Sequence, residues 1–218
     1  MIDSYEKLTI GKYRELLALD SNVEQIDYGV SILSILTDYT EDELYDMPLD
    51  EFSSLMSKAN FIQQQIDRTN WKKIGKEIVI NGKKYEIIKD AKKMTAGQYI
   101  DYRNYTKDSD KFLDLLPFIL TIFIIPSGCK YGKDYDVNEL AQELNDHLDI
   151  KTALSISDFF LHQSKVSTMT SLVSLRWMMK RMMKKEKNQE AKEKIQNALV
   201  QMDYLYILLK NGDGFTQQ

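Results

Sequence analysis

The feature that most constrains the fold of this chain is a pattern that occurs twice, 86 residues apart. Leu8–Tyr13 (LTIGKY) is loosely matched by Met94–Tyr99 (MTAGQY). The same offset aligns the apolar segments Ile32–Leu36 and Phe118–Ile122. Each copy contains an apolar residue, a threonine, a small-residue turn of helix, a tyrosine, a polar stretch and then an apolar helix. The pattern predicts a scaffold of two similar helical units, and it contains no motif that specifies a reaction.

A threonine opens each copy of the pattern. Thr9 and Thr95 both precede residues with helical spacing, and threonine is a favoured N-cap because its hydroxyl accepts a hydrogen bond from a free backbone N–H. We therefore expect Thr9 and Thr95 to cap helices over residues 9–18 and 95–105. The repeat argument requires both threonines to lie at helix starts rather than within helices.

Other helix signals occur along most of the chain, and only 3 prolines and 9 glycines interrupt them. Thr40 followed by Glu43 is a capping-box signature, so a short helix is expected to begin there and to end before Pro48. Apolar periodicity predicts the remaining helices. Their expected ranges are 27–38, 48–67, 111–125, 136–144, 150–163, 167–187 and 188–210.

Residues 76–88 have the alternating pattern of strands rather than helices. Asn81-Gly82 lies between two apolar segments, and this dipeptide favours a type I′ turn because both central residues need a positive φ. The pattern predicts a β-hairpin. A lone hairpin is marginal in water, so we expect it to pack on helices or to pair with another strand.

These elements together predict a mainly α, bundle-like protein with a β-hairpin insertion and an internal helical repeat. The expected organisation has four parts. They are a helical unit at 1–70, a hairpin connector at 71–93, a second helical unit at 94–165, and amphipathic helices with a frayed end at 166–218.

Charge and composition exclude several classes of protein. The net charge of −4 argues against general nucleic-acid binding. The single Cys129 cannot form an internal disulfide, which fits a reducing compartment. The polar segment Met1–Lys7 does not resemble a signal peptide. The apolar segment Leu115–Pro126 is shorter than the roughly 20 residues that span a bilayer, so we expect no membrane association.

The residue types that most often carry catalysis or bind metals are few and scattered. His147 and His162 are the only histidines, and neither lies in a metal-ligand spacing. Cys129 has no histidine nearby in the sequence, and a bystander thiol is the simplest interpretation. We therefore predict no catalytic, cofactor-binding or metal site, and a protein that is not an enzyme.

The segment 176–185 combines methionine and tryptophan with cations at helical spacing, and it allows three interpretations. It is a helix that binds a protein partner, because methionine surfaces adapt to varied shapes; or a basic stripe that contacts nucleic acid; or a core-facing methionine stripe with a solvated basic face. The candidate partner-binding residues are Trp177, Met178, Lys180, Arg181, Met182, Lys184 and Lys185.

Several short motifs give the chain a resemblance to a known group of proteins. They are Leu8–Tyr13, Thr40–Leu44, Asp46–Leu49, Ile80–Tyr85, Met94–Asp101, a helix ending at Pro126, and Phe159-Phe160. This succession resembles the small helical tail assembly chaperones and virion-associated proteins of tailed bacteriophages. The resemblance covers about residues 5–165, and it omits the basic helix and the C-terminal segment.

The resemblance implies a non-enzymatic phage assembly protein. As a tail assembly chaperone it would bind apolar helical segments of the tape-measure protein and recruit tube subunits. Its partners would be other phage assembly or virion proteins, with homo-oligomers among its forms. It would act in the host cytoplasm or reside in the virion. Two alternatives remain: a structural virion component (a ring, connector or packaged protein), and a nucleic-acid-associated protein that acts through residues 176–187.

The nucleic-acid alternative makes a prediction that separates it from the others. If the basic helix binds DNA, its affinity should fall steeply as the salt concentration rises. The reason is that lysine and arginine side chains that bind the phosphates release the counterions condensed on the DNA. Replacing Lys180, Arg181, Lys184 and Lys185 with alanine would then abolish binding in a fluorescence-anisotropy titration. An affinity for DNA that is absent, or unchanged in this variant, rejects the alternative.

Overall fold

A computed structural model describes residues 1–66, 74–90, 93–107, 111–186 and 188–211, and side chains are described throughout except at 161–172, 185, 205 and 208–211. Predictions for the remaining positions, including the frayed end, lie outside the described residues. The described chain is mainly helical with a small antiparallel sheet, which confirms the predicted fold class.

The chain divides into two compact units, Met1–Phe159 and Phe160–Gln218. The first unit groups the predicted helical segments of both halves with the hairpin between them. The division falls inside the long helix α8 (Ile150–Lys185). The predicted border at 165/166 falls within the same helix.

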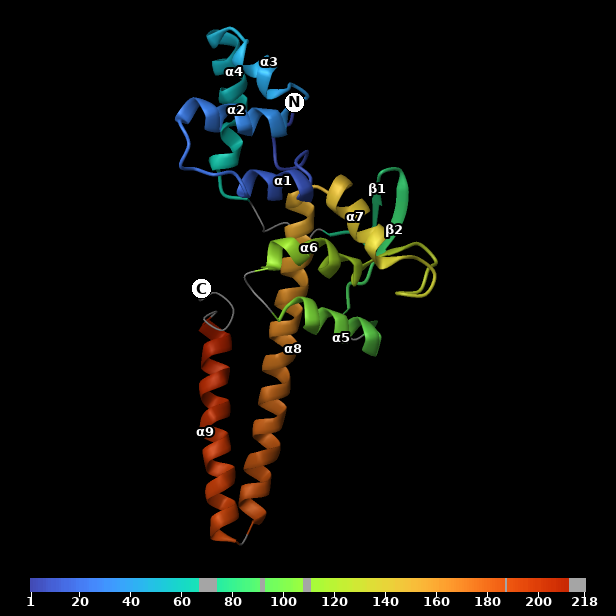
Figure 1. The fold of residues 1–218 in the computed structure, drawn as a ribbon. Helices are drawn as coiled ribbons and strands as arrows, with labels where there is room; N and C mark the ends of the chain where they lie inside the picture. Colours follow the sequence, from blue (N-terminus) through green and yellow to red (C-terminus); the bar gives the residue numbers. More distant parts are fainter. Residues whose placement is uncertain (67–73, 91–92, 108–110, 187, 212–218) are drawn as a thin grey trace. The chain divides into compact units, whose positions relative to one another are not determined.

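Four helices form the N-terminal part of the first unit (Figure 1). They are α1 (Ile10–Leu17), α2 (Gln25–Leu36), α3 (Glu41–Tyr45) and α4 (Leu49–Ala59). The apolar face of α2 is buried, including Val30, Leu33 and Leu36. Thr40 and Glu43 form the predicted capping box at the start of α3.

The helix predicted over 48–67 is shorter than expected. α4 ends at Ala59 and is followed by a 3₁₀ turn, η1 (Asn60–Gln63). The physical reason is a tertiary contact, because the Tyr5 hydroxyl lies 2.9 Å from the carbonyl oxygens of both Ile62 and Gln64 and donates its one hydrogen between them. The Tyr5 ring also meets the Phe61 ring edge-on at 5.1 Å. These contacts need free carbonyl groups at Ile62 and Gln64, which in a continuing helix would accept backbone hydrogen bonds instead.

The predicted hairpin is confirmed. β1 (Glu77–Ile80) pairs antiparallel with β2 (Lys83–Ile87), and Asn81 and Gly82 have φ values of 49° and 73°. The hairpin also pairs with a third strand, β3 (Ile124–Pro126), which gives the sheet order β1-β2-β3. This pairing is one of the two outcomes expected for a hairpin that cannot be stable alone.

The strand β3 occupies residues that the sequence predicted as helix. α6 (Phe112–Thr121) ends four residues before the predicted end at 125. Ile124 and Ile125 are β-branched, and a residue before proline disfavours the α conformation, so Pro126 helps to turn this segment into a strand. The Gln98 side chain donates to the carbonyl of Ile122 at 2.7 Å, which satisfies an acceptor left free at the end of α6.

Thr9 and Thr95 are both N-caps, as predicted. The Thr9 hydroxyl accepts from the amide of Lys12 at 3.4 Å. Thr95 starts α5 (Ala96–Tyr105) with a full capping box. The backbone amide of Gln98 donates to the Thr95 hydroxyl, and the backbone amide of Thr95 donates to the side-chain oxygen of Gln98. Asp136 likewise caps α7 (Val137–His147), which runs three residues beyond its predicted end.

The C-terminal helices differ from the prediction in one respect. The segments 150–163 and 167–187 were expected to be separate helices, but α8 is continuous from Ile150 to Lys185. The range contains no proline or glycine, so nothing in it breaks the backbone hydrogen bonding. α9 (Gln189–Asn211) agrees with the helix predicted over 188–210.

The turn of the hairpin provides a test of its conformation. Replacing Asn81-Gly82 with Val-Val should destabilise the first unit, because β-branched residues disfavour positive φ. Thermal unfolding followed by circular dichroism should show a lower Tm, whereas Asn81→Asp, which tolerates the turn, should leave it nearly unchanged. An unaltered Tm for Val-Val would contradict the role given to the turn.

The two N-caps provide a second test. Thr9→Ala and Thr95→Ala should each lower the free energy of unfolding by about 1 kcal/mol, because each leaves a helix N–H without its acceptor. Urea denaturation measures the loss, and Thr→Ser at either site is the matched control because it keeps the hydroxyl. The cap assignment fails if serine and alanine are equally destabilising.

Candidate functional site

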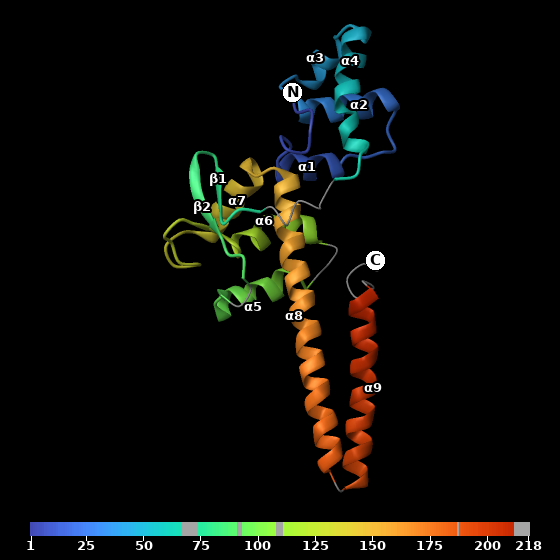
Figure 2. The same cartoon turned by 180° about the vertical axis from the view of Figure 1, so that it is seen from behind.

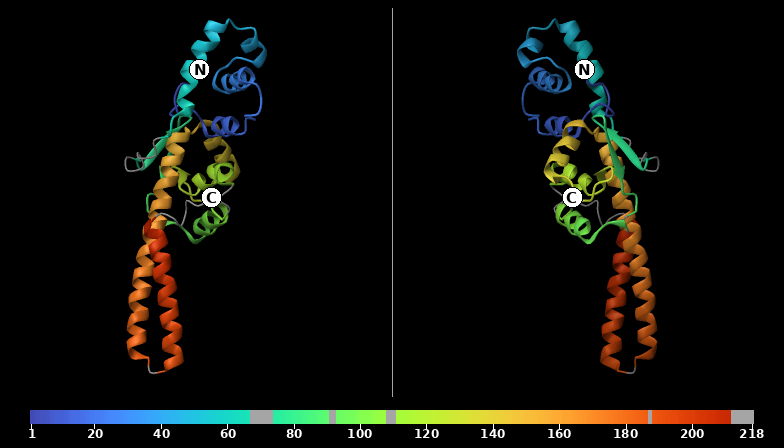
Figure 3. Two further views of the ribbon diagram at one scale, coloured as in Figure 1. Left: turned by 90° about the vertical axis from the view of Figure 1, so that its left-hand side faces the viewer. Right: turned by 90° about the vertical axis from the view of Figure 1, so that its right-hand side faces the viewer.

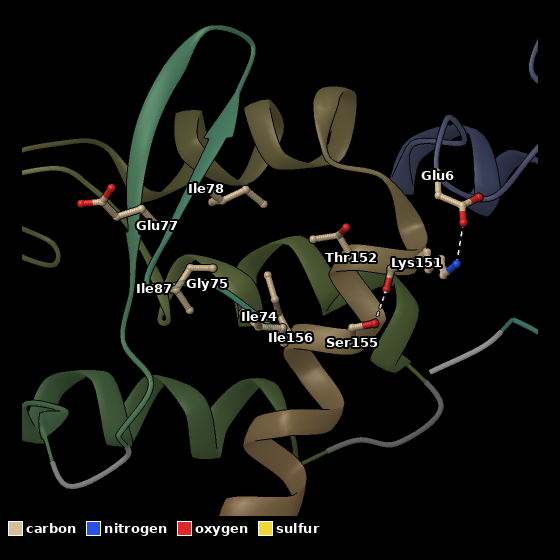
Figure 4. A pocket seen from close by; sticks show the side chains of 10 residues that line it. All are labelled: Glu6, Ile74, Gly75, Glu77, Ile78, Ile87, Lys151, Thr152, Ser155 and Ile156. Atoms are coloured by element: carbon tan, nitrogen blue, oxygen red, sulfur yellow. Dashed lines mark hydrogen bonds and ion pairs between the residues drawn. The ribbon is translucent and has the colours of Figure 1, made fainter. Parts of the chain in front are cut away.

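Two features of the described residues could contact a partner or ligand, and the first is a pocket in the first unit (Figure 4). It lies beside the start of α8 and the β1–β2 hairpin. Its lining residues are Glu6, Ile74, Gly75, Glu77, Ile78, Ile87, Lys151, Thr152, Ser155 and Ile156.

The polar groups of this pocket serve the structure around them. Lys151 forms an ion pair with Glu6, and this hydrogen bond holds the pKa of Glu6 below its usual range. The Ser155 hydroxyl donates to the carbonyl of Lys151 at 2.7 Å. Thr152 hydrogen-bonds to Asp149, which caps α8 by accepting from the Thr152 amide at 2.8 Å. These groups hold the start of α8 in place. The rest of the lining consists of four isoleucines, Gly75, and Glu77, which forms an ion pair with Lys84.

The second feature is the helical hairpin of the second unit, formed by α8 from Phe160 onward and α9. The two helices lie side by side and run in opposite directions (Figures 2 and 3). Asn188 starts α9, and its side chain accepts from the Ala191 amide at 3.2 Å. The backbone amide of Asn188 donates to the Glu186 carboxylate at 2.9 Å. Local side-chain hydrogen bonds therefore stabilise the start of α9.

The two helices of this hairpin contact each other through a narrow seam. Leu199 and Met202 of α9 are buried, and Met179 and Met183 of α8 are half-buried. Across the seam, the guanidinium of Arg176 binds the carboxylate of Asp203 through Nε and Nη2, at 2.7 and 3.1 Å. Only Nη2 donates a hydrogen bond in this ion pair, and both groups are partly exposed, so the pair favours one register of the two helices more than it adds stability.

Apolar side chains remain exposed on both helices. On α8, exposed apolar side chains include Leu175, Met178 and Met182, spaced i, i+3, i+7, which we call the α8 stripe. On α9 they are Val200, Tyr204 and Ile207, spaced i, i+4, i+7, which we call the α9 stripe. Each of these side chains is at least 43% exposed. Such spacing places each set on one helix face, in the arrangement that packs against another helix.

A third exposed set lies on a different face of α8. Trp177, Lys180, Arg181 and Lys184 recur at three- and four-residue intervals, and we call them the basic stripe. The Arg181 guanidinium lies over the Trp177 ring at 5.5 Å from its centroid. This cation–π contact keeps the charge against an indole that is itself 64% exposed.

The structure brings most of the predicted partner-binding residues to the surface. Trp177, Met178 and Met182 are exposed, as are Lys180, Arg181 and Lys184, while the side chain of Lys185 lies outside the described residues. The core-facing interpretation fits a different pair, since Met179 and Met183 face the seam.

Sequence reasoning missed Leu175 and the whole of the α9 stripe. The signal was present, because α9 carries a second apolar spacing at 200, 204 and 207 beside the buried Leu199 and Met202.

The remaining candidates stand apart from the hairpin. His147 is the last residue of α7, and Cys129 is a half-buried free thiol. The side chain of His162 lies outside the described residues. Among the side chains that the structure describes, no group of three or more His, Cys, Asp and Glu could hold a metal ion. None of the described helices combines the length and apolar character needed to cross a membrane.

Comparison with known proteins gives no relative: no family model matches the chain, and no match is found among curated proteins or solved structures.

The cap of α8 gives a prediction about pH. Burial raises the pKa of Asp149, so the ionised carboxylate is disfavoured in the folded state. This penalty is absent below the pKa of the unfolded chain and is fully present once the pH exceeds the folded pKa. Asp149→Asn keeps the hydrogen-bond acceptor without the charge. The free energy of unfolding of this variant, relative to that of wild type, should therefore be greater at about pH 7 than at about pH 4.

Urea denaturation at the two pH values measures this difference. Asp149→Ala is the control, because it removes both the charge and the cap: its stability relative to wild type should change with pH in the same way, but it should lie about 1 kcal/mol below that of Asp149→Asn at either pH. A difference between Asp149→Asn and wild type that does not change with pH would contradict the assignment.

Proposed function

We infer that this protein is a non-enzymatic assembly protein whose helical hairpin binds apolar helical segments of a partner, and specifically a tail assembly chaperone of a tailed bacteriophage. The observation that carries the binding function is the presence of two exposed apolar stripes on one helical hairpin. The phage context comes from the sequence resemblance, which covers about residues 5–165.

The hairpin suits a helical partner for energetic reasons. Covering apolar surface contributes about 25 cal/mol per Å², so the α8 and α9 stripes favour a partner that buries them. An amphipathic helix is the simplest occupant, because its apolar positions recur at the same three- and four-residue intervals as the side chains of each stripe. The methionines of the α8 stripe have flexible, polarisable side chains, which allow one surface to accept helical segments of different shapes.

A structural virion component is the second candidate, and the sheet favours it. In the order β1-β2-β3, β1 is an edge strand, and Val79 on it is exposed. Edge strands pair readily with strands of neighbouring subunits, as a ring or connector would require. A chaperone leaves the particle after assembly, whereas a component remains at a fixed copy number.

Mass spectrometry of purified mature particles and of infected lysate separates these candidates. A chaperone should be abundant in lysate and absent from particles. Presence in particles at a fixed symmetric multiple of the major capsid protein would reject the chaperone in favour of the component. Absence from both would reject the phage context itself.

The role of the hairpin is tested by affinity capture from infected lysate with tagged full-length chains. Met178→Ser with Met182→Ser should remove most of the captured partner, because the α8 stripe loses its apolar contact area. Ile26→Ser is the matched control, since it also replaces an exposed apolar side chain but lies on α2, outside the hairpin and outside the edge strand β1. Equal capture by both variants would reject the hairpin as the binding site.

A further inference from the structure

Charge is unevenly distributed along this chain. Residues 1–159 contain 19 Lys and Arg against 28 Asp and Glu, whereas residues 160–218 contain 10 against 5. The excess of cations in the second unit is concentrated near the turn of the hairpin, in residues 176–187. Lys180, Arg181 and Lys184 of the basic stripe are exposed, and none of them forms an ion pair with another described residue. The basic stripe therefore presents uncompensated positive charge beside the exposed Trp177.

This charge decides which kind of surface the basic stripe fits. Two hairpins that paired through their basic stripes would bring like charges together, which is unfavourable at an interface. A complementary partner must carry clustered carboxylates, with apolar side chains among them to cover the indole of Trp177. Such a surface exists on this chain itself.

The acidic surface of the first unit lies around α3. The chain contains no Lys or Arg between Arg14 and Lys58, and it contains 11 Asp and Glu in that interval. Seven of these lie in residues 38–51, and all seven are exposed. They are Asp38, Glu41, Asp42, Glu43, Asp46, Asp50 and Glu51. None of them forms an ion pair with another described residue. We call residues 38–51 the acidic surface.

Exposed apolar side chains lie among these carboxylates. Tyr39, Tyr45 and Leu49 are exposed, and Leu49 is 75% exposed. Two contacts hold this surface in place. The side chain of Leu44 in α3 is buried, and the Tyr45 hydroxyl donates to the Asp27 carboxylate of α2 at 2.8 Å. A preorganised surface of this kind loses little entropy on binding, and tyrosine is enriched at protein interfaces.

We propose that the basic stripe of one copy binds the acidic surface of a second copy. The exposed Trp177 packs against Tyr39, Tyr45 and Leu49 of the other molecule, while the cations of the stripe face its carboxylates. Each copy carries both surfaces, so the contact is heterologous and can repeat from copy to copy. The α8 stripe lies on a different face of the helix and stays available to the partner inferred above, so this self-association is independent of partner binding.

Charge reversal tests the contact directly. The stripe variant carries Lys180→Glu, Arg181→Glu and Lys184→Glu, and the acidic-surface variant carries Asp38→Lys, Asp42→Lys and Asp46→Lys. These acidic positions leave the Thr40–Glu43 capping box intact. Sedimentation velocity of the full-length chain, treated with nuclease, should show self-association that weakens as salt is raised from about 50 to 500 mM. Each variant alone should associate at least about 100-fold more weakly.

Restoration is the decisive observation. Mixing the two variants juxtaposes opposite charges again, so the mixture should associate, and so should a chain that carries all six changes. A control chain with Glu15→Lys, Glu24→Lys and Glu139→Lys has the same change in net charge as the acidic-surface variant. It should associate like wild type, because these exposed residues lie outside the acidic surface. Circular dichroism verifies that every variant is folded.

Three results would overturn the proposal. One is a wild-type chain that sediments as a monomer at every concentration. Another is a mixture that fails to associate although both variants are folded. The third is a six-change chain that is folded but remains a monomer. None of these results bears on partner capture through Met178 and Met182, so the two proposals fail separately.

Discussion

The first unit depends on a short antiparallel contact between two distant segments. The amide of Ile150 donates to the carbonyl of Leu8 at 2.8 Å, and the amide of Ile10 donates to the carbonyl of Leu148 at 3.1 Å. All four side chains are buried. The contact lies at the starts of α1 and α8, so it joins the N-terminal helices to the beginning of the longest helix. Burial makes these hydrogen bonds costly to break, because no water replaces them.

Most helix starts could be predicted from the sequence because they depend on local chemistry. A capping hydroxyl at Thr9, Thr40 or Thr95 acts within four residues, and the Asn81-Gly82 turn acts within two. Helix ends were harder to predict because they depend on distant residues. α4 ends before a turn whose backbone carbonyls accept from the Tyr5 hydroxyl. α6 ends before Ile124 and Ile125, which pair with β2 as a strand. Neither partner lies near those ends in the sequence.

The candidate site shows the same division between local and distant information. The seven candidate partner-binding residues of α8 could be predicted from the local combination of methionine, tryptophan and cations. Six of the seven have exposed side chains in the described structure. Which methionines face the seam could not be predicted, because this depends on the position of α9. One register of the two helices is favoured by Arg176 and Asp203, which are 27 residues apart, and no local pattern links them.

The division of the chain inside α8 has a practical consequence for dissecting the protein. Most units are separated by a loop, where the chain can be cut without exposing backbone hydrogen bonds. Here a cut at 159/160 would create two new helix ends, with up to four free carbonyls on one fragment and four free amides on the other. Fragments should therefore overlap within α8 and carry added caps. Without them, a loss of binding or stability would report on frayed ends rather than on the missing unit.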